Sequence, residues 1–452
     1  MAEGIRSGAT INRDYEKRPY WHATMPALPE RSGRELRERV DVVVVGGGYT
    51  GVACAWKLAA SGASVTLLET NNLGWGASTR NGGIIHPGFK WGPAELTERY
   101  GDAVGPALYR ETQAGYAFVR DTIRANRIAC EFREQGLLEL ASGHSHVPEL
   151  AEAQEGLAFI GVDSQVLAGS ELRAEIGSDA FPAALAMGGS GLLHPGKWFA
   201  GLVGLADAAG ADLHEGVRAR RIRRGRDGRM TVDTSRGRID AGDVVIATNG
   251  YTDGVAPSLR RRILPIGSYI IATEPLPESL ARQVAPTGRA FFDTKNFLNY
   301  WHVSEDRRML FGGRVSFMPT NVDRTAGLLH RQMLSIYPEL ADYRIEYSWG
   351  GKVALTMDRM PHVGRMAGIA YAMGYCGTGL AMSTYLGARV AEWLGGGTAP
   401  ALARLEFPIV PAPYEGRPWF LPVVGEWFRL KDWLARRSRP SDVSPVEATR
   451  GG

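Results

Sequence analysis

A glycine-rich turn has the residue types and the spacing that bind a pyrophosphate. It reads Gly46-Gly47-Gly48-Tyr49-Thr50-Gly51 and directly follows the β-branched run at residues 40–45. Gly46 allows the tight turn, Gly48 allows backbone to approach a phosphate closely, and Gly51 allows the following helix to pack against the strand. The positive end of that helix's dipole would face the phosphates.

An acidic residue at the end of the next expected strand completes this pattern. Glu69 follows the turn by roughly 20 residues, where a carboxylate accepts hydrogen bonds from ribose hydroxyls. A carboxylate at this position also disfavours a 2′-phosphate. A glycine-rich turn can occur without any ligand, but strand, turn, helix and acid together predict a dinucleotide site. They do not distinguish NAD from FAD.

Four further segments can distinguish the two cofactors: a loop after the second strand, a buried strand that ends in a polar turn, a segment with an acid before a Pro and a Gly, and a glycine-rich turn at the start of a helix. They are residues 74–83 (GWGASTRNGG), 244–250 (VVIATNG), 356–364 (TMDRMPHVG) and 374–379 (GYCGTG). Together with Trp349-Gly350-Gly351, this set resembles the D-amino-acid-oxidase-like superfamily of FAD oxidoreductases, which includes sarcosine and glycine oxidases. Within the superfamily the chain is most similar to the gamma-glutamylputrescine oxidase branch, over about residues 15–425.

The resemblance implies FAD bound in an extended form, with residues 78–83 beside the flavin and the amides of residues 374–379 facing its pyrimidine end. An ordinary glycine-containing helix cap is the alternative for that last turn. The residues implied for the cofactor are Gly46, Gly48, Tyr49, Thr50, Gly51, Glu69, Ser78, Thr79, Arg80, Asn81, Gly82, Gly83, Val217, Thr248, Gly350, Gly374, Tyr375, Gly377, Thr378 and Gly379. A second turn of this kind, for a nicotinamide, is missing, so electrons are expected to leave to oxygen, a quinone or a carrier protein.

The sequence favours FAD that is not covalently attached. Some members of the superfamily attach FAD through a Cys shortly before the acid-containing segment, but residues 348–353 contain none. Others use a His in the loop after Ser-Thr, where this chain has Asn81. Cys376 and His86 remain as alternative attachment points, although Cys376 is better explained as a small packing residue.

The substrate-facing candidates are Tyr300, His302, Arg314 and Lys352, and we expect the wall to include Tyr269, Asn299 and Trp301 as well. Amino-acid oxidases of the superfamily carry an Arg that binds the substrate carboxylate, and Val353 stands at that position here. An amine whose reacting end lacks a carboxylate, such as an acylated polyamine, is therefore expected. An N-alkyl amino acid held by Arg314 is the alternative. The aromatic residues could equally be core, and hydride transfer from a neutral amine needs no protein base such as His302.

Two different patterns of secondary structure are expected to position these residues. A βαβ beginning predicts a Rossmann-type, glutathione-reductase-like FAD-binding domain of α/β class, and the short alternating strands of residues 256–350 predict an antiparallel-sheet substrate domain of α+β class. We expect an N-terminal extension at 1–39, a discontinuous FAD-binding domain at 40–90, 145–255 and 345–400, a substrate domain at 91–144 and 256–344, and a tail at 401–452. Helices are expected at 49–60, 93–128, 324–336 and 380–394, and strands at 40–45, 64–68, 131–140, 229–246, 263–272, 298–303, 309–313 and 369–373.

Composition excludes several classes of function. The chain has 452 residues and a net charge of only +4, with scattered Arg residues, so it lacks the basic patch of a nucleic-acid-binding protein. Three Cys without a C-x-x-C pair fit a reducing compartment and oppose a structural metal site. The N-terminus is polar, and no apolar run of about 18 residues is present, so we expect a cytoplasmic protein without a transmembrane segment.

The C-terminal tail leaves a second function open. Aromatic residues and flanking Arg and Lys at residues 418–437 could lie at a membrane surface, as in a dehydrogenase that passes electrons to a quinone. A helix docked on its own protein or on a second copy is the simpler interpretation. A flavin-binding scaffold or sensor without turnover is a third possibility, which spectra with substrate would decide.

Overall fold

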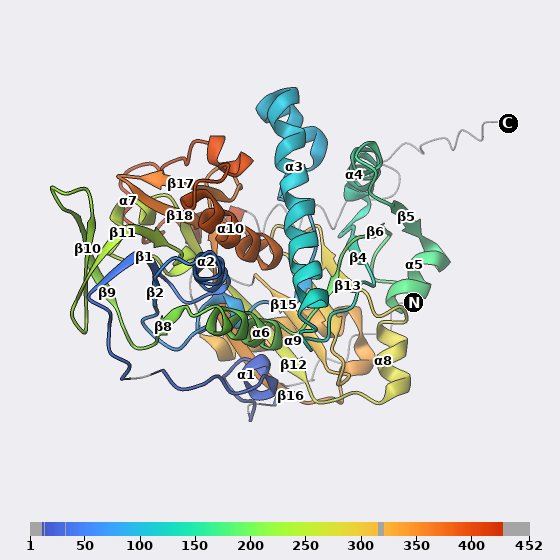
Figure 1. The fold of residues 1–452 in the computed structure, drawn as a ribbon. Coiled ribbons are helices and arrows are strands. Elements are labelled where there is room, and N and C mark those ends of the chain that lie inside the picture. Colours follow the sequence, from blue (N-terminus) through green and yellow to red (C-terminus); the bar gives the residue numbers. More distant parts are fainter. Residues whose placement is uncertain (1–10, 13, 32, 315–320, 428–452) are drawn as a thin grey trace.

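The fold is built around two sheets that share a cavity between them (Figure 1). The computed structural model describes residues 11, 12, 14–31, 33–314 and 321–427. Each sheet has eight strands, and a small third sheet pairs β3 (Ile84–Ile85) with β7 (Gly191–Leu192). The expected combination of an α/β part and a part with an antiparallel sheet is confirmed.

The first sheet contains the glycine-rich turn. Its strands run in the order β17 (His362–Met366), β18 (Ile369–Met373), β11 (Arg238–Ile246), β1 (Arg39–Val45), β2 (Val65–Leu68) and β8 (Asp212–His214), and β9 (Ala219–Arg224) and β10 (Met230–Thr234) extend it from β11. β1 pairs in parallel with β2 and with β11. Val43 and Val44 on adjacent positions of β1 are fully buried, as expected for a strand covered on both faces.

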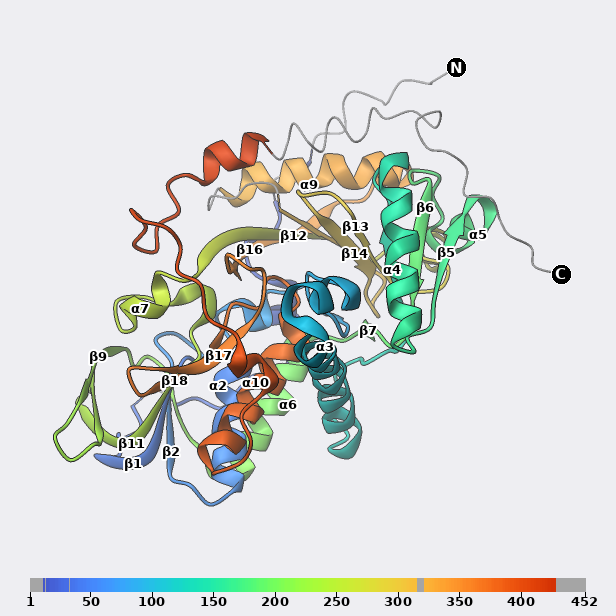
Figure 2. The same cartoon turned by 90° about the horizontal axis from the view of Figure 1, so that it is seen from above.

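Three helices lie side by side along one face of the first sheet (Figure 2). They are α2 (Tyr49–Ala60), α6 (Pro195–Ala208) and α10 (Gly379–Leu394), and α2 contacts both of the others. α2 and α10 approach closely, because a Cβ added to Gly387 would lie only 2.2 Å from the carbonyl oxygen of Thr50. This contact places the start of α2 against the middle of α10.

The second sheet forms the floor of the substrate side. Its order is β16 (Ile345–Leu355), β12 (Leu264–Thr273), β15 (Met309–Gly313), β14 (Asn299–Val303), β13 (Ala290–Asp293), β4 (Leu137–Leu140), β6 (Ala183–Met187) and β5 (Ser164–Ala168). All its neighbours are antiparallel except β13 and β4. α9 (Val322–Ile336) packs across β12, β15 and β16 (Figure 2).

Strand pairing corrects two of the expected domain boundaries. β5 and β6 were expected in the FAD-binding domain, but β6 pairs with β4 and extends the second sheet. β16 was also expected there, but it pairs with β12 along its whole length. In both cases, backbone hydrogen bonds to a strand distant in the sequence determine to which sheet the strand belongs. The expected strand at 131–140 shortens to β4, and the one at 229–246 is a β10–β11 hairpin.

The N-terminal segment packs into the protein and is more ordered than its sequence predicted. It forms a short helix, α1 (Tyr20–Thr24), in which Tyr20 and Trp21 are buried. The ring centroid of Trp21 lies 4.7 Å from that of His194 and 6.4 Å from that of Trp349. The segment is ordered because the aromatic side chains of Tyr20 and Trp21 are buried against the rest of the protein. Its mostly polar composition gave no sign of this.

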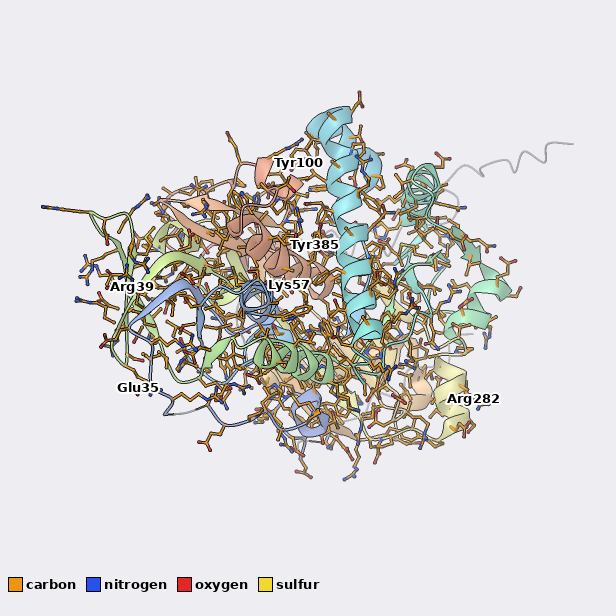
Figure 3. The ribbon with its side chains drawn as sticks, in the orientation of Figure 1. Glu35, Arg39, Lys57, Tyr100, Arg282 and Tyr385 are labelled. Atoms are coloured by element: carbon orange, nitrogen blue, oxygen red, sulfur yellow. The ribbon has the colours of Figure 1, made fainter. Side chains whose placement is uncertain are left out.

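The longest helix stands beside both sheets (Figure 1). α3 (Pro93–Ala125) contacts α10 and α4 (Val147–Phe159), and Figure 3 shows Tyr385 of α10 pointing towards it. The ring of Tyr385 lies 6.1 Å from that of Phe118. The remaining helices are α5 (Gly169–Ile176), α7 (Pro257–Arg260) and α8 (Glu278–Val284). Within the described ranges, no helix combines the length and the apolar character needed to cross a bilayer.

Candidate active site

A cavity of about 990 Å³ runs between the two sheets. The first sheet contributes the turn at 46–50, the loop at 75–82 and the turn at 375–380. The second contributes side chains that include Glu139, Tyr300 and Arg314. A dinucleotide turn and a separate wall of side chains therefore face the same space.

The glycine-rich turn leaves no room for side chains. Gly46 has a φ of 112°, and a Cβ there would lie 2.8 Å from the carbonyl oxygen of Ala247. A Cβ on Gly51 would lie 1.9 Å from the carbonyl oxygen of Gly46, and one on Gly48 would lie 2.8 Å from Oγ of Ser78. The close helix–strand packing expected of Gly51 is therefore present, and the start of α2 lies open to the cavity.

Hydrogen bonds hold the polar groups around this turn. The two carboxylate oxygens of Glu69 accept from the amides of Gly47 and Asn71, each at 2.8 Å. The hydroxyl of Ser78 accepts from the amide of Tyr49 at 2.9 Å. Glu69 is thus oriented at the cavity wall before any ligand arrives.

A hydroxyl pair joins the starts of α2 and α10. The hydroxyls of Thr50 and Tyr375 lie 2.7 Å apart, and both residues line the cavity. Two helix N-termini are thereby held at one end of the site, where both favour negative charge.

Three aromatic side chains from three elements hold the loop at residues 80–82. The indole of Trp349 donates to the carbonyl of Arg80 at 3.0 Å, and that of Trp21 donates to the carbonyl of Asn81 at 2.8 Å. Nε2 of His302 donates to the carbonyl of Gly82 at 2.9 Å. Asn81 adds a bond within the loop, because its Oδ1 accepts from the amide of Gly83 at 2.9 Å.

His302 was a candidate base, and the structure corrects that role. It is 3% exposed and does not line the cavity. Because a carbonyl can only accept, Nε2 carries the proton in its bond to Gly82. Burial lowers the pKa of the ring to about 4, with Arg133 acting in the same direction. His302 is therefore a neutral positioning residue for the loop.

Tyr300 does line the cavity, beside that loop. Its ring packs directly against two glycines. A Cβ added to Gly82 would lie 2.7 Å from the ring, and one added to Gly312 would lie 2.3 Å from it. Gly312 is its register partner on β15. The Tyr300 hydroxyl lies 3.2 Å from that of Ser268, and burial raises its pKa.

Lys352 and Val353 both line the cavity, although neighbouring residues on a strand point to opposite faces. β16 is the edge strand of the second sheet. The Lys352 ammonium lies 5.2 Å from the ring centroid of Tyr251, whose hydroxyl accepts from the Lys352 amide at 3.1 Å.

Arg314 lies where the second sheet meets the turn that begins α10. Its Nη2 is 3.4 Å from the position a Cβ would take on Gly377. Burial lowers the pKa of the guanidinium, and the Cys376 thiol opposes that shift. Cys376 is buried, with its thiol 3.1 Å from the carbonyl of Gly374 and 3.3 Å from the hydroxyl of Thr356.

Most of the residues selected from the sequence meet in this one cavity. Those that line it are Gly46, Gly48, Tyr49, Thr50, Glu69, Ser78, Arg80, Asn81, Gly82, Thr248, Tyr375, Gly377, Thr378, Gly379, Tyr300, Arg314 and Lys352. Those that do not are Gly51, Thr79, Gly83, Val217, Gly350, Gly374 and His302. Several of the second group support the first: Val217 donates its amide to the carbonyl of Glu69 at 2.8 Å, and Gly350 accepts from Arg80 at 3.1 Å.

Sequence reasoning missed seven charged residues that line the cavity, which are Lys90, Glu95, Glu139, Glu149, Glu152, Arg218 and Asp253. Desolvation within the cavity and the nearby Arg314 guanidinium together lower the pKa of the Lys90 amine to about 8. Burial raises the pKa of Glu139 to about 6, which Lys90 opposes and Glu149 reinforces. A signal for Glu139 was present, since it is the one acid in the strand Leu137-Leu138-Glu139-Leu140.

Comparison with known proteins identifies relatives over most of the chain. The DAO family, described as FAD dependent oxidoreductase, matches residues 41–393. A probable oxidoreductase, OrdL, of Rhizobium meliloti (strain 1021) is 32% identical over 91% of this chain and 97% of that protein. The gamma-glutamylputrescine oxidoreductase of Escherichia coli (strain K12) is 32% identical over 82% of this chain and 88% of that protein.

Solved structures share the fold at lower identity. Glycine oxidase from Geobacillus kaustophilus superposes with a TM-score of 0.69 at 23% identity, covering 82% of this chain and 100% of that one. L-proline dehydrogenase from P. horikoshii gives a TM-score of 0.66 at 20% identity, covering 86% and 99%. These similarities concern the fold of the two sheets and their helices.

Proposed function

The chain belongs to the DAO family of FAD-dependent oxidoreductases, and from that premise we propose that it oxidises the C–N bond of an amine to an imine. The observation that carries the proposal is the single cavity, in which the dinucleotide turn at Gly46 and the side-chain wall at Tyr300 face the same space. A substrate on that wall would lie next to the loop at residues 80–82.

The residues present fit FAD. The N-termini of α2 and α10 face the cavity, the turn at residues 46–51 has no space for side chains, and Glu69 is oriented at the wall. When bound, FAD accepts the hydrogen and the two electrons that leave the substrate. The chain itself binds, orients and excludes water, with apolar side chains such as Leu185 and Phe292 in the wall.

One charge near the wall suits a substrate that reacts as a neutral amine. Arg314 lines the cavity and acts electrostatically on Tyr300. A nearby positive charge disfavours a second one, so Arg314 would lower the pKa of an amine bound beside Tyr300 and favour the form with a free lone pair. That lone pair stabilises the cation that forms when hydride leaves the adjacent carbon, and no base such as His302 is required.

An acylated diamine is the substrate class we favour. The Escherichia coli relative is named for gamma-glutamylputrescine, which belongs to this class. Val353, which lines the wall beside Lys352, offers no charge to a carboxylate on the reacting carbon. An N-alkyl amino acid held by Arg314 is the competing substrate.

Oxygen is the acceptor we favour, and a quinone at a membrane surface is the alternative. One observation supports the alternative: Trp419 and Val423, near the end of the described chain, are 63% and 78% exposed. Leu421 between them is buried, which fits a segment docked on its own protein. The rest of the aromatic and basic segment at residues 428–437 lies outside the described residues.

Anaerobic flavin bleaching tests the reaction, and oxygen uptake tests the acceptor. We expect an acylated diamine to bleach the flavin much faster than glycine, sarcosine or alanine, and air to restore it with formation of peroxide. Fast bleaching by glycine or sarcosine that is lost in Arg314→Ala would identify an amino-acid oxidase. Slow reoxidation by air and fast reoxidation by a soluble quinone would identify a dehydrogenase.

A further inference from the structure

The N-terminal segment at residues 14–25 contacts both parts of the fold. Its Glu16 extends the second sheet at β16, because the Glu16 amide donates to the carbonyl of Glu346 at 2.8 Å and the Glu16 carbonyl accepts from the amide of Ser348 at 3.0 Å. Its helix, α1, lies beside α6, which covers the first sheet (Figure 1). The segment therefore bridges the side that carries the dinucleotide turn and the side that forms the substrate wall.

His22 of this segment is hydrogen-bonded to Thr79, in the loop beside the cavity. Nε2 of His22 lies 2.5 Å from the Thr79 hydroxyl, and that hydroxyl donates to the carbonyl of Gly74 at 2.7 Å. A carbonyl only accepts, so the single hydroxyl proton is used on Gly74 and the hydroxyl oxygen accepts from Nε2 of His22. Burial lowers the pKa of His22 to about 4, with Arg80 and Arg18 acting in the same direction, so the ring is neutral at pH 7.

The two neighbours of this contact connect it to the dinucleotide turn. The amide of Gly74 donates to the carbonyl of Gly47 at 2.9 Å. The hydroxyl of Ser78, the residue before Thr79, accepts from the amide of Tyr49 at 2.9 Å. Gly47 lies in the turn, and Tyr49 is the first residue of α2. The loop is thus held between the N-terminal segment on one side and the dinucleotide turn on the other.

Packing leaves the backbone at Gly74 little freedom to adjust. Its φ is 77°, and a Cβ there would lie 2.7 Å from the ring of Phe199 and 2.9 Å from Cγ2 of Thr79. Phe199 belongs to α6 and is fully buried. Because such close-packed groups move only together, a displaced Thr79 would disturb Gly74 and, through it, the carbonyl of Gly47.

We propose that His22 is a positioning residue for FAD, and that docking of the N-terminal segment and binding of FAD stabilise each other. His22 does not line the cavity and acts through Thr79. Two binding events are coupled when both favour the same arrangement of the loop between them, and this coupling is reciprocal. The inference concerns the cofactor of the family and is independent of the substrate that is oxidised.

A double-mutant cycle on FAD affinity tests the pair. The readout is the dissociation constant of FAD, measured by flavin fluorescence on apoprotein. His22→Ala removes the donor and should raise this constant about tenfold. Thr79→Val keeps the shape of the side chain and should raise it at least as much, because Gly74 also loses its donor. The double variant should bind FAD as Thr79→Val does, since His22 then has no acceptor left to lose.

A conservative variant and a matched pair provide the controls. His22→Gln should restore the dissociation constant to within about threefold of the parent value, because a glutamine amide can donate as Nε2 does. His146 and Thr294 form another His–Thr pair, with Nδ1 and the hydroxyl 2.8 Å apart, and neither residue lines the cavity. His146→Ala should leave the constant unchanged.

Hydrogen exchange measures the same coupling from the other end. FAD should slow exchange of the amides of residues 14–25 at least about fivefold more than it slows exchange in α4, which corrects for stabilisation of the whole protein. In His22→Ala this difference should be lost, because the segment no longer contacts the loop through Thr79.

The outcomes decide each part of the inference. Additive effects in the cycle would show that His22 acts by packing alone, and would overturn its role as a positioning residue. Equal slowing of exchange in the N-terminal segment and in α4 would overturn the coupling. If His22→Ala does not fold, Thr79→Ser replaces it in the test: it keeps the hydroxyl and should bind FAD as the parent does, and a loss equal to that of Thr79→Val would overturn the role of this hydrogen bond.

Discussion

The indole N–H of Trp21 donates to the carbonyl oxygen of Asn81 over 2.8 Å, from a residue 60 positions earlier in the chain. Trp21 belongs to α1, which the sequence did not predict, and Asn81 belongs to the loop beside the cavity. The N-terminal segment is thus part of the support of the FAD site.

Replacing Trp21 by Phe should weaken FAD binding. The change keeps an aromatic ring but leaves the half-buried carbonyl of Asn81 without the indole donor, at a cost of about 1–3 kcal/mol. The dissociation constant of FAD, measured by flavin fluorescence on apoprotein, should rise about tenfold or more. Trp419→Phe is the control, since it also removes an indole hydrogen bond (3.1 Å to Pro413), but at an exposed site. Equal constants in the two variants would show that the loop does not depend on Trp21.

Gly51→Ala should abolish FAD binding or prevent folding. The new carbon would lie 1.9 Å from the carbonyl oxygen of Gly46, so α2 would have to move away from the turn. Gly204→Ala on α6 is the matched control, because nothing lies within 4 Å of its Cβ position, and it should stabilise the protein by up to about 1 kcal/mol. Thermal unfolding and flavin absorbance measure both effects. A yellow, normally stable Gly51→Ala protein would contradict the assigned packing.

His302→Gln should retain most of the rate of flavin bleaching, and His302→Ala should lose more of it. A glutamine amide can donate to the carbonyl of Gly82 as Nε2 of His302 does, whereas alanine cannot. Because the pKa of His302 is about 4, its ring stays neutral from pH 6 to 9 and adds no step to the rate profile there. A loss of 100-fold or more in His302→Gln, about the contribution of a general base, would restore the catalytic role.

Acid precipitation should release all the flavin. Cys376 is the buried thiol beside the cavity, and its contacts with Gly374 and Thr356 engage it within the protein. The supernatant should carry the whole yellow colour, in the parent and in Cys376→Ser alike. Colour that stays with the precipitate of the parent and leaves that of Cys376→Ser would identify a covalent bond to this residue, and His86→Asn provides the same test for the other candidate.

The sequence by itself determined the parts of this protein that depend on local order. α2 begins at Tyr49 and ends at Ala60 as predicted, because a β-branched strand, a glycine-rich turn and an apolar-periodic segment follow each other directly. The dinucleotide class of the cofactor could be predicted for the same reason, because the residues of the turn and Glu69 belong to one βαβ unit.

Only the tertiary structure decided which distant segments meet. β6 and β16 join the second sheet through ladders to β4 and β12, and no local pattern encodes a partner so far along the chain. Glu139 acquires its place in the cavity from register with Phe292 and Leu185, and His302 turns from a candidate base into a support because the carbonyl of Gly82 lies beside it. Residue types set the chemistry that is possible, but burial and partners, which arise only on folding, set the charge and the role of each group.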